Sequence, residues 1–197
     1  MKHTMLYMTL LAACATAACG KEEVKEPEKE LPMTSSEYIS FKVSATSPSE
    51  ETVITWEAVS DRIGVFVSDA GTGSALNDNA YYDAFTSTSS SRFFPLKDAD
   101  KLKWEEGKKY DVALYYPFSV KMKDATSIPV SVDEDQTVPI PLTSMQLKKE
   151  QLFVSSLKSV ERPDNGILEM SLSPVVSFVK INVSSNLPVA CKSIKIT

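Results

Sequence analysis

Short stretches in which apolar and polar residues alternate recur along the chain from residue 38 onward. Such alternation places successive side chains on opposite faces and is the pattern of a half-buried β-strand. Clusters of Ser, Gly, Asn, Asp and Pro separate the stretches, as turns would. The predicted strands are residues 38–44, 52–57, 62–68, 111–118, 152–160, 167–173, 178–184 and 193–197.

Two local signals refine this pattern. Asp164-Asn165-Gly166 is a strong turn sequence and predicts a hairpin that joins 152–160 to 167–173. Residues 144–151 are the one helical candidate. Many short strands at this spacing predict an all-β fold, an antiparallel β-sandwich.

The first residues have the pattern of an export signal. Lys2 and His3 precede an apolar run from Met5 to Ala18, as a positive segment precedes a hydrophobic one in secretory signals. A membrane-spanning helix needs roughly 20 apolar residues, and this run is shorter. The sequence therefore predicts a signal peptide over residues 1–18 rather than a transmembrane anchor.

Two cysteines near the end of this run resemble the lipobox of bacterial lipoproteins, whose cysteine thiol is acylated. Cys14 follows Leu-Ala-Ala and fits the consensus better, but cleavage before it leaves a short apolar core. Cleavage before Cys19 leaves a fuller core and a charged start. We expect lipidation at Cys19, with Cys14 as the alternative and a plain cleaved signal as a third possibility. Acyl chains contribute about 0.8 kcal/mol per buried CH₂, so they would hold the protein at a membrane.

Residues 19–36 are predicted to form a lipidated, charged tether. Only Val24 and Leu31 are aliphatic before Pro32, so the segment cannot bury enough apolar surface to offset the entropy of ordering it. Pro27 interrupts the helix that its Glu–Lys spacing would allow. The charged residues are Lys21, Glu22, Glu23, Lys25, Glu26, Glu28, Lys29 and Glu30.

Composition argues against several classes of protein. The net charge is −5 without a basic stripe, which argues against nucleic acid. The only histidine, His3, lies in the predicted signal, so His-dependent nucleophilic sites and most zinc sites are not expected. Gly71-x-Gly73 lacks the remaining residues of a nucleotide-binding loop. Processing at Cys19 would leave Cys191 alone, as a small buried thiol without a disulfide partner. We expect no enzyme activity and no cofactor.

Several stretches resemble the fimbrillin-like family of Gram-negative anaerobes. Its members carry a Trp, then a D-x-I-G-V-F strand, an N-x-x-Y strand and a strand that ends in Tyr-Tyr-Pro. Here these elements are Trp56, Asp61–Phe66, Asn79–Tyr82 and Tyr110–Pro117. Family members are two-domain, all-β surface proteins, usually lipoproteins. The resemblance covers roughly residues 36–197 and implies a fimbrillin-like β-sandwich, of the transthyretin-like or Greek-key type, over residues 37–197.

The bulky residues of these motifs have a structural explanation first. Trp56, Phe66, Tyr115 and Phe118 are expected to pack in the core. Gly64 inside a strand indicates a close approach of neighbouring atoms or a bulge. We therefore expect fold determinants rather than binding residues here.

The resemblance implies adhesion or fimbria assembly at the cell outer membrane, with other fimbrial subunits or a host or bacterial surface receptor as partners. Some family members polymerise after a protease removes their first strand and the next subunit's strand replaces it. The corresponding strand here is 38–44. No arginine occurs before Arg62, so arginine-directed cleavage is in doubt, and an anchor, accessory protein or independent adhesin fits better than a shaft subunit. The candidate strand-exchange residues are Tyr38, Ile39, Phe41 and Val43.

Two weaker signals give alternatives. Oxygen-bearing side chains cluster at 133–135 and 69–79, as calcium ligands do, but neither cluster keeps the spacing of a calcium-binding loop, so no metal is expected. Trp104 could offer an exposed ring to a sugar, although packing is the favoured interpretation. A carbohydrate-capturing surface lipoprotein is therefore the alternative function. The strand 193–197 either closes a sheet or precedes a further carboxyl-terminal domain, and both remain open.

Overall fold

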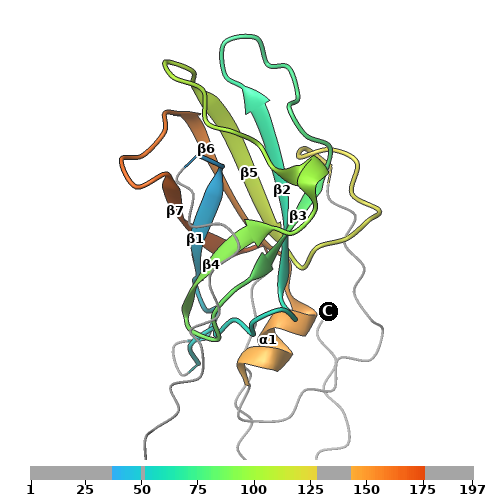
Figure 1. The fold of residues 1–197 in the computed structure, drawn as a ribbon. Helices are drawn as coiled ribbons and strands as arrows, with labels where there is room; N and C mark the ends of the chain where they lie inside the picture. The colour runs from blue at the N-terminus through green and yellow to red at the C-terminus, as the bar shows by residue number, and fades with distance from the viewer. Residues whose placement is uncertain (1–36, 50–51, 128–142, 176–197) are drawn as a thin grey trace, which may run out of the picture. The chain divides into compact units, whose positions relative to one another are not determined.

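The computed structural model describes residues 37–49, 52–127 and 143–175. Within these ranges the chain forms seven β-strands, one short α-helix and one 3₁₀ turn (Figure 1). In chain order the elements are β1 Ser40–Ala45, β2 Arg62–Asp69, β3 Ala80–Ala84, β4 Ser90–Pro95, η1 Asp98–Asp100, β5 Tyr110–Tyr116, α1 Ser144–Glu150, β6 Phe153–Val160 and β7 Ile167–Pro174.

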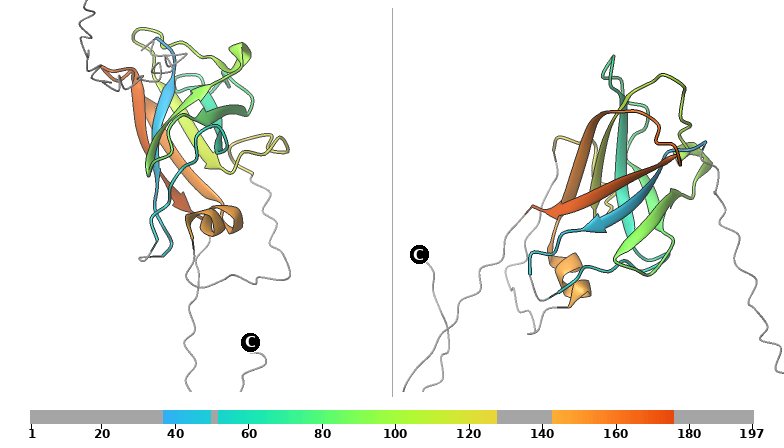
Figure 2. Two further views of the ribbon diagram at one scale, coloured as in Figure 1. Left: turned by 60° about the horizontal axis from the view of Figure 1, so that its bottom comes forward. Right: turned by 90° about the vertical axis from the view of Figure 1, so that its left-hand side faces the viewer.

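The strands close into a barrel in the order β1-β4-β3-β2-β5-β6-β7. β1 lies beside β4 on one side and beside β7 on the other (Figure 2). The pairs are antiparallel except for β1 and β7, which run parallel. The all-β class is as predicted, whereas the antiparallel sandwich was wrong. Sandwich and barrel strands share one alternating pattern because both bury one face, so the closure by β1 and β7 left no local signal.

Alternation along each strand fills the barrel with apolar side chains. In β1, Phe41 and Val43 are fully buried while Lys42 is exposed. In β7, Leu168 and Met170 point inward on the same face. The buried apolar cluster also contains Ile39, Ile54, Trp56, Ile63, Val65, Val67, Ala80, Tyr82, Ala84, Phe93, Trp104, Tyr110, Val112, Leu114, Tyr116, Leu147, Phe153 and Leu172.

The helix α1 lies at one end of the barrel (Figures 1 and 2). Thr143 and Gln146 form a capping box that satisfies backbone groups at its start. Leu147 of the same turn is completely buried. The predicted helix at 144–151 is therefore confirmed, to within one residue.

Two predicted elements differ from the structure, and one strand was not predicted. Residues 52–57 are not a strand; within them Trp56 N donates to Thr88 O across 2.9 Å, but the segment pairs with no strand as a ladder. The Gly166 turn is present, but β6 and β7 pair only near Phe153 and Val154, so no tight hairpin forms. β4 was missed, since its "SSRFFP" begins in a serine-rich stretch typical of turns. The predicted strands 178–184 and 193–197 lie outside the described residues.

Candidate functional site

The four candidate strand-exchange residues lie on or directly before β1. Ile39, Phe41 and Val43 are fully buried in the barrel. Tyr38 is half-buried and forms an isolated bridge with Lys103. The backbone N–H of Ile39 donates to Leu102 O across 2.8 Å. The structure thus places Ile39, Phe41 and Val43 on one inward face, whereas Tyr38 lies outside it.

β1 fills a slot between two strands that are distant in sequence. Phe41 is opposite Phe93 of β4 and opposite Leu168 of β7. On the outer face, Lys42 Nζ lies 3.1 Å from Glu169 Oε1, an exposed ion pair of little energetic weight. Without β1, the hydrogen-bonding edges of β4 and β7 and the inner pockets for its side chains would all be open.

A tryptophan outside the sheet holds β1 in place through a buried hydrogen bond. Trp56 is buried, and its Nε1–H donates to Val43 O across 2.8 Å. Its ring meets Phe93 edge-on at a centroid distance of 5.3 Å, and Tyr116 at 5.2 Å. Edge-to-face packing of this kind favours a fixed geometry. Trp56 therefore links β1 to β4 and β5, as expected of a fold determinant.

A buried ion pair lies beside Trp56, where α1 meets the barrel. Lys148 of α1 pairs with Asp61, and both side chains are less than a tenth exposed. Asp61 also accepts a 2.7 Å hydrogen bond from the Tyr116 hydroxyl and another of 2.7 Å from Glu57 N–H. Burial, and then the bond to Asp61, raise the pKa of the Tyr116 hydroxyl well above its ordinary value. Sequence reasoning missed Lys148, because nothing in a helical lysine indicates burial.

Gly64 lies under an aromatic ring. A Cβ at Gly64 would come within 1.8 Å of Tyr115 Cε1, so the expected close approach is confirmed. The Tyr115 ring stacks on Phe66 at 6.0 Å. Phe66 and Phe118 are only half-buried, so their assignment to the core was wrong; both lie on the outer face, and Phe118 packs on Tyr81.

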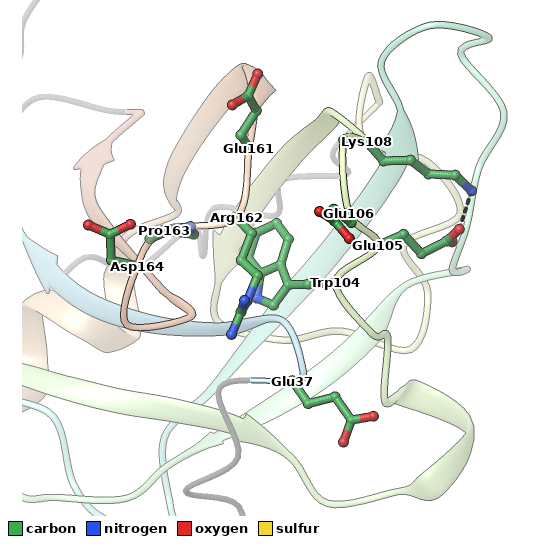
Figure 3. Close-up of a pocket in the computed structure, with 10 residues that line it drawn as sticks. Glu37, Trp104, Glu105, Glu106, Lys108, Glu161, Arg162, Pro163 and Asp164 are labelled. Atoms are coloured by element: carbon green, nitrogen blue, oxygen red, sulfur yellow. Dashed lines mark ion pairs between the residues drawn. The ribbon is translucent and has the colours of Figure 1, made fainter.

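A hollow of about 770 Å³ lies between the loop before β5 and the loop after β6 (Figure 3). Trp104 borders it, but the indole is only 8% exposed. Its Nε1–H donates to Gly166 O across 3.0 Å, and its ring packs on Tyr110. Lys108 Nζ is held by Glu105 at 2.6 Å. The favoured packing role of Trp104 is confirmed. Its ring is not exposed enough to stack on a sugar.

The 69–79 loop uses its oxygen atoms internally. Asp69 Oδ1 accepts from Gly71 N and Thr72 N, at 2.9 and 2.8 Å, and the bond from Thr72 N is the main cause of the lowered pKa of this carboxyl. Asn77 Oδ1 accepts from Val67 N at 2.7 Å. Over the described ranges, no three His, Cys, Asp or Glu side chains are grouped to hold a metal ion. The acidic cluster at 133–135 lies outside those ranges.

Several predictions fall on residues that the structure does not describe. They are the signal peptide 1–18, lipidation at Cys19 or Cys14, the tether 19–36 and the thiol of Cys191. Among the described residues, no helix has the length and apolar character needed to cross a membrane.

Comparison with known proteins gives one family. The sequence profile of the fimbrillin-like family matches residues 45–197, which is most of the chain. Among functionally curated proteins the comparison found no match.

Solved structures show more distant likenesses. A cell adhesion protein of Bacteroides uniformis shares 19% identity at a TM-score of 0.43, over 70% of this chain and 46% of the other. A cell adhesion protein of Bacteroides ovatus shares 14% identity at a TM-score of 0.46, over 70% and 51%. A fimbrial protein of Bacteroides ovatus shares 16% identity at 0.34, over 70% and 28%. The chain thus spans about half or less of the length of these structures, and likenesses this remote carry no argument about function.

Proposed function

Since this chain belongs to the fimbrillin-like family, we propose that it is a non-enzymatic, lipid-anchored surface protein that acts in adhesion or in the assembly of fimbriae. The partners would be other fimbrial subunits or a surface receptor. The observation that carries the assembly part is the position of β1, paired on both sides and closing the barrel.

β1 has the properties of an exchangeable strand. It is six residues long and precedes the other described strands in the chain. An incoming extended segment would gain main-chain hydrogen bonds to β4 and β7 and would bury side chains where Phe41 and Val43 now lie. An intact β1 blocks that site, so exchange requires its release.

Arginine-directed release is not the route that this chain favours. Arg62 is the first arginine, and it begins β2 with its Nε 2.8 Å from Asp83 Oδ1. Cleavage there would separate β1 together with Trp56 and Asp61, on which the barrel end depends. An anchor, an accessory protein or an independent adhesin therefore fits better than a shaft subunit.

Strand exchange is tested with a chain that lacks residues 38–45 and a synthetic peptide of the same residues. We expect the intact chain to form oligomer ladders on native gels, the truncated chain to lose them because the exchanged strand is missing, and the peptide to bind the truncated chain. A peptide with Phe41→Asp and Val43→Asp should not bind, whereas one with Lys42→Ala, changed on the outer face, should. Ladders that persist in the truncated chain, or equal binding of all peptides, would contradict exchange at this slot.

Lipid anchoring is tested by metabolic labelling with an alkyne fatty acid and by intact mass after detergent extraction. We expect the label to be lost in Cys19→Ala and kept in Cys14→Ala. The reverse result would identify Cys14 as the acylated residue, and an unlabelled native protein would remove the anchor from the proposal.

The alternative function, carbohydrate capture, gains no support from Trp104, because both the nitrogen and the ring of that residue are engaged in packing. A sugar site on this protein would need another surface.

A further inference from the structure

A second concave surface lies on the outer face of the barrel, where two aromatic rings meet. Tyr81 points outward from β3, and Phe118 follows β5. Their rings lie 5.4 Å apart at an angle of 48° and are both half-buried. They line a pocket of about 460 Å³ between the η1 segment and the loop after β5, segments that lie on the same side of the barrel in Figure 1.

The loop that forms one wall is fixed by side-chain hydrogen bonds. Asn79 Nδ2 donates to Ser119 O at 2.8 Å and to Met122 O at 3.0 Å. The Tyr115 hydroxyl donates to Asn79 Oδ1 at 2.7 Å, and Phe118 N donates to Arg62 O at 3.0 Å. The wall is thus positioned before any ligand arrives, which lowers the entropic cost of binding.

Four charged side chains around the rings have no ion pair within the described ranges. They are Asp78, Lys97, Asp100 and Lys123. This contrasts with the hollow beside Trp104, where Lys108 is tied to Glu105. Two carboxylates and two ammonium groups cancel in charge, so the pocket favours a neutral ligand that can both donate and accept hydrogen bonds.

We propose that the pocket between Tyr81 and Phe118 binds a neutral sugar residue of a glycan. The C–H face of a pyranose ring would pack on Phe118, because the Tyr81 ring already has Lys97 Nζ 4.7 Å from its centroid. Sugar hydroxyls would donate to Asp100 and Asp78 and accept from Lys97 and Lys123. The volume suits one or two sugar rings, since small-ligand pockets measure about 300–1,000 Å³.

The inference deepens the adhesive part of the proposed function and is independent of strand exchange. It is tested by saturation-transfer difference NMR on the full chain, with the methyl glycosides of glucose, galactose, mannose, fucose and N-acetylglucosamine. We expect transfer to at least one glycoside, strongest at the protons of one ring face, and a dissociation constant at least tenfold higher in Phe118→Ala.

Matched variants keep the test specific. Phe66→Ala also removes a half-buried ring that stacks on a tyrosine, and we expect it to leave sugar binding unchanged. Asp100→Asn should weaken binding at least fivefold, whereas Asp98→Asn, which alters a carboxylate already paired with Lys101, should not. If Phe118→Ala fails to fold, the comparison of Asp100→Asn with Asp98→Asn decides the question.

Two results would overturn the assignment: no transfer to any of the five glycosides, or transfer that survives both Phe118→Ala and Asp100→Asn. Neither result bears on oligomer ladders, so failure of the sugar site and failure of strand exchange remain distinguishable.

Discussion

The indole nitrogen of Trp56 donates a 2.8 Å hydrogen bond to the carbonyl oxygen of Val43, so a residue outside the sheet holds the first strand of the barrel in place. The bond is buried and joins two residues that are close in sequence: Val43 in β1 and Trp56 in the connection from β1 to β2. Retention of β1 therefore depends on Trp56 as well as on the main-chain ladders to β4 and β7.

Replacement of Trp56 by Phe should loosen β1 selectively. The change keeps an aromatic ring but leaves the Val43 carbonyl without its donor, and an unsatisfied buried acceptor costs about 1–3 kcal/mol. We expect a lower free energy of unfolding and faster hydrogen exchange across residues 40–45, measured by mass spectrometry. Trp104→Phe is the control, since it also loses an indole hydrogen bond, to Gly166, but should leave exchange in β1 unchanged.

The ion pair of Lys148 and Asp61 should behave as a unit. Asp61→Ala would leave an ammonium group buried without its partner, which costs about 3–5 kcal/mol, measured by urea denaturation. The double variant Asp61→Leu/Lys148→Met should recover part of that loss, because no charge is then left unpaired, while the Tyr116 hydroxyl and Glu57 N–H still lack their acceptor. Lys42→Ala, which breaks the exposed pair with Glu169, should cost less than about 1 kcal/mol. A double variant as unstable as the single one would contradict this account.

Five of the seven described strands, β1, β2, β5, β6 and β7, could be predicted from the sequence because each carries its own alternating pattern. Phe41 and Val43 of β1, or Leu168 and Met170 of β7, alternate with polar residues within a few positions. β4 has no such signal, because its inward residues include Ser91, which resembles the turn residues before it. Local pattern thus located most strands but not their order around the barrel.

The features that could not be predicted from the sequence depend on contacts between residues far apart in the chain. The parallel pairing of Phe41 with Leu168 joins residues at opposite ends of the described chain, and nothing near either residue indicates it. The packing of Trp104 was the favoured interpretation, but its partners Gly166 and Tyr110 could not be predicted. The candidate residues of β1 were nevertheless predicted as one face, because their spacing of two depends only on strand geometry.

Gly64 should tolerate no side chain. An added Cβ would overlap the Tyr115 ring, whose hydroxyl is fixed by Asn79, so the ring cannot move freely. We expect Gly64→Ala to lower the free energy of unfolding by about 3 kcal/mol, at the upper end of overpacking costs, in chemical denaturation. Gly71→Ala, where the nearest atom is Asp69 Oδ1 at 3.3 Å, should cost less than about 1 kcal/mol. Equal costs at the two positions would contradict the close approach at Gly64.

The stability of the barrel should fall at alkaline pH through Tyr82. Burial, with a smaller contribution from the charge of Asp100, raises the pKa of the Tyr82 hydroxyl far above its ordinary value. The folded chain therefore keeps this proton at a pH where the unfolded chain loses it. Below the ordinary tyrosine pKa of about 10 the stabilising contribution is fully present, and it is lost progressively as the pH rises beyond that value.

A tyrosine of this kind costs about 1.4 kcal/mol of stability per pH unit well above pH 10, and about 1 kcal/mol between pH 10 and 11, where the unfolded side chain is still partly protonated. We expect Tyr82→Phe to remove that loss of about 1 kcal/mol, measured by urea denaturation at each pH. In Tyr82→Phe the stability should still fall somewhat with rising pH, because burial also raises the pKa of the Tyr116 hydroxyl. The variant also loses the weak hydrogen bond from the Tyr82 hydroxyl to Asp100 O, at 3.3 Å. This loss lowers its stability equally at every pH and does not affect the slope. An unchanged slope in Tyr82→Phe would mean that this hydroxyl is not kept protonated by its burial.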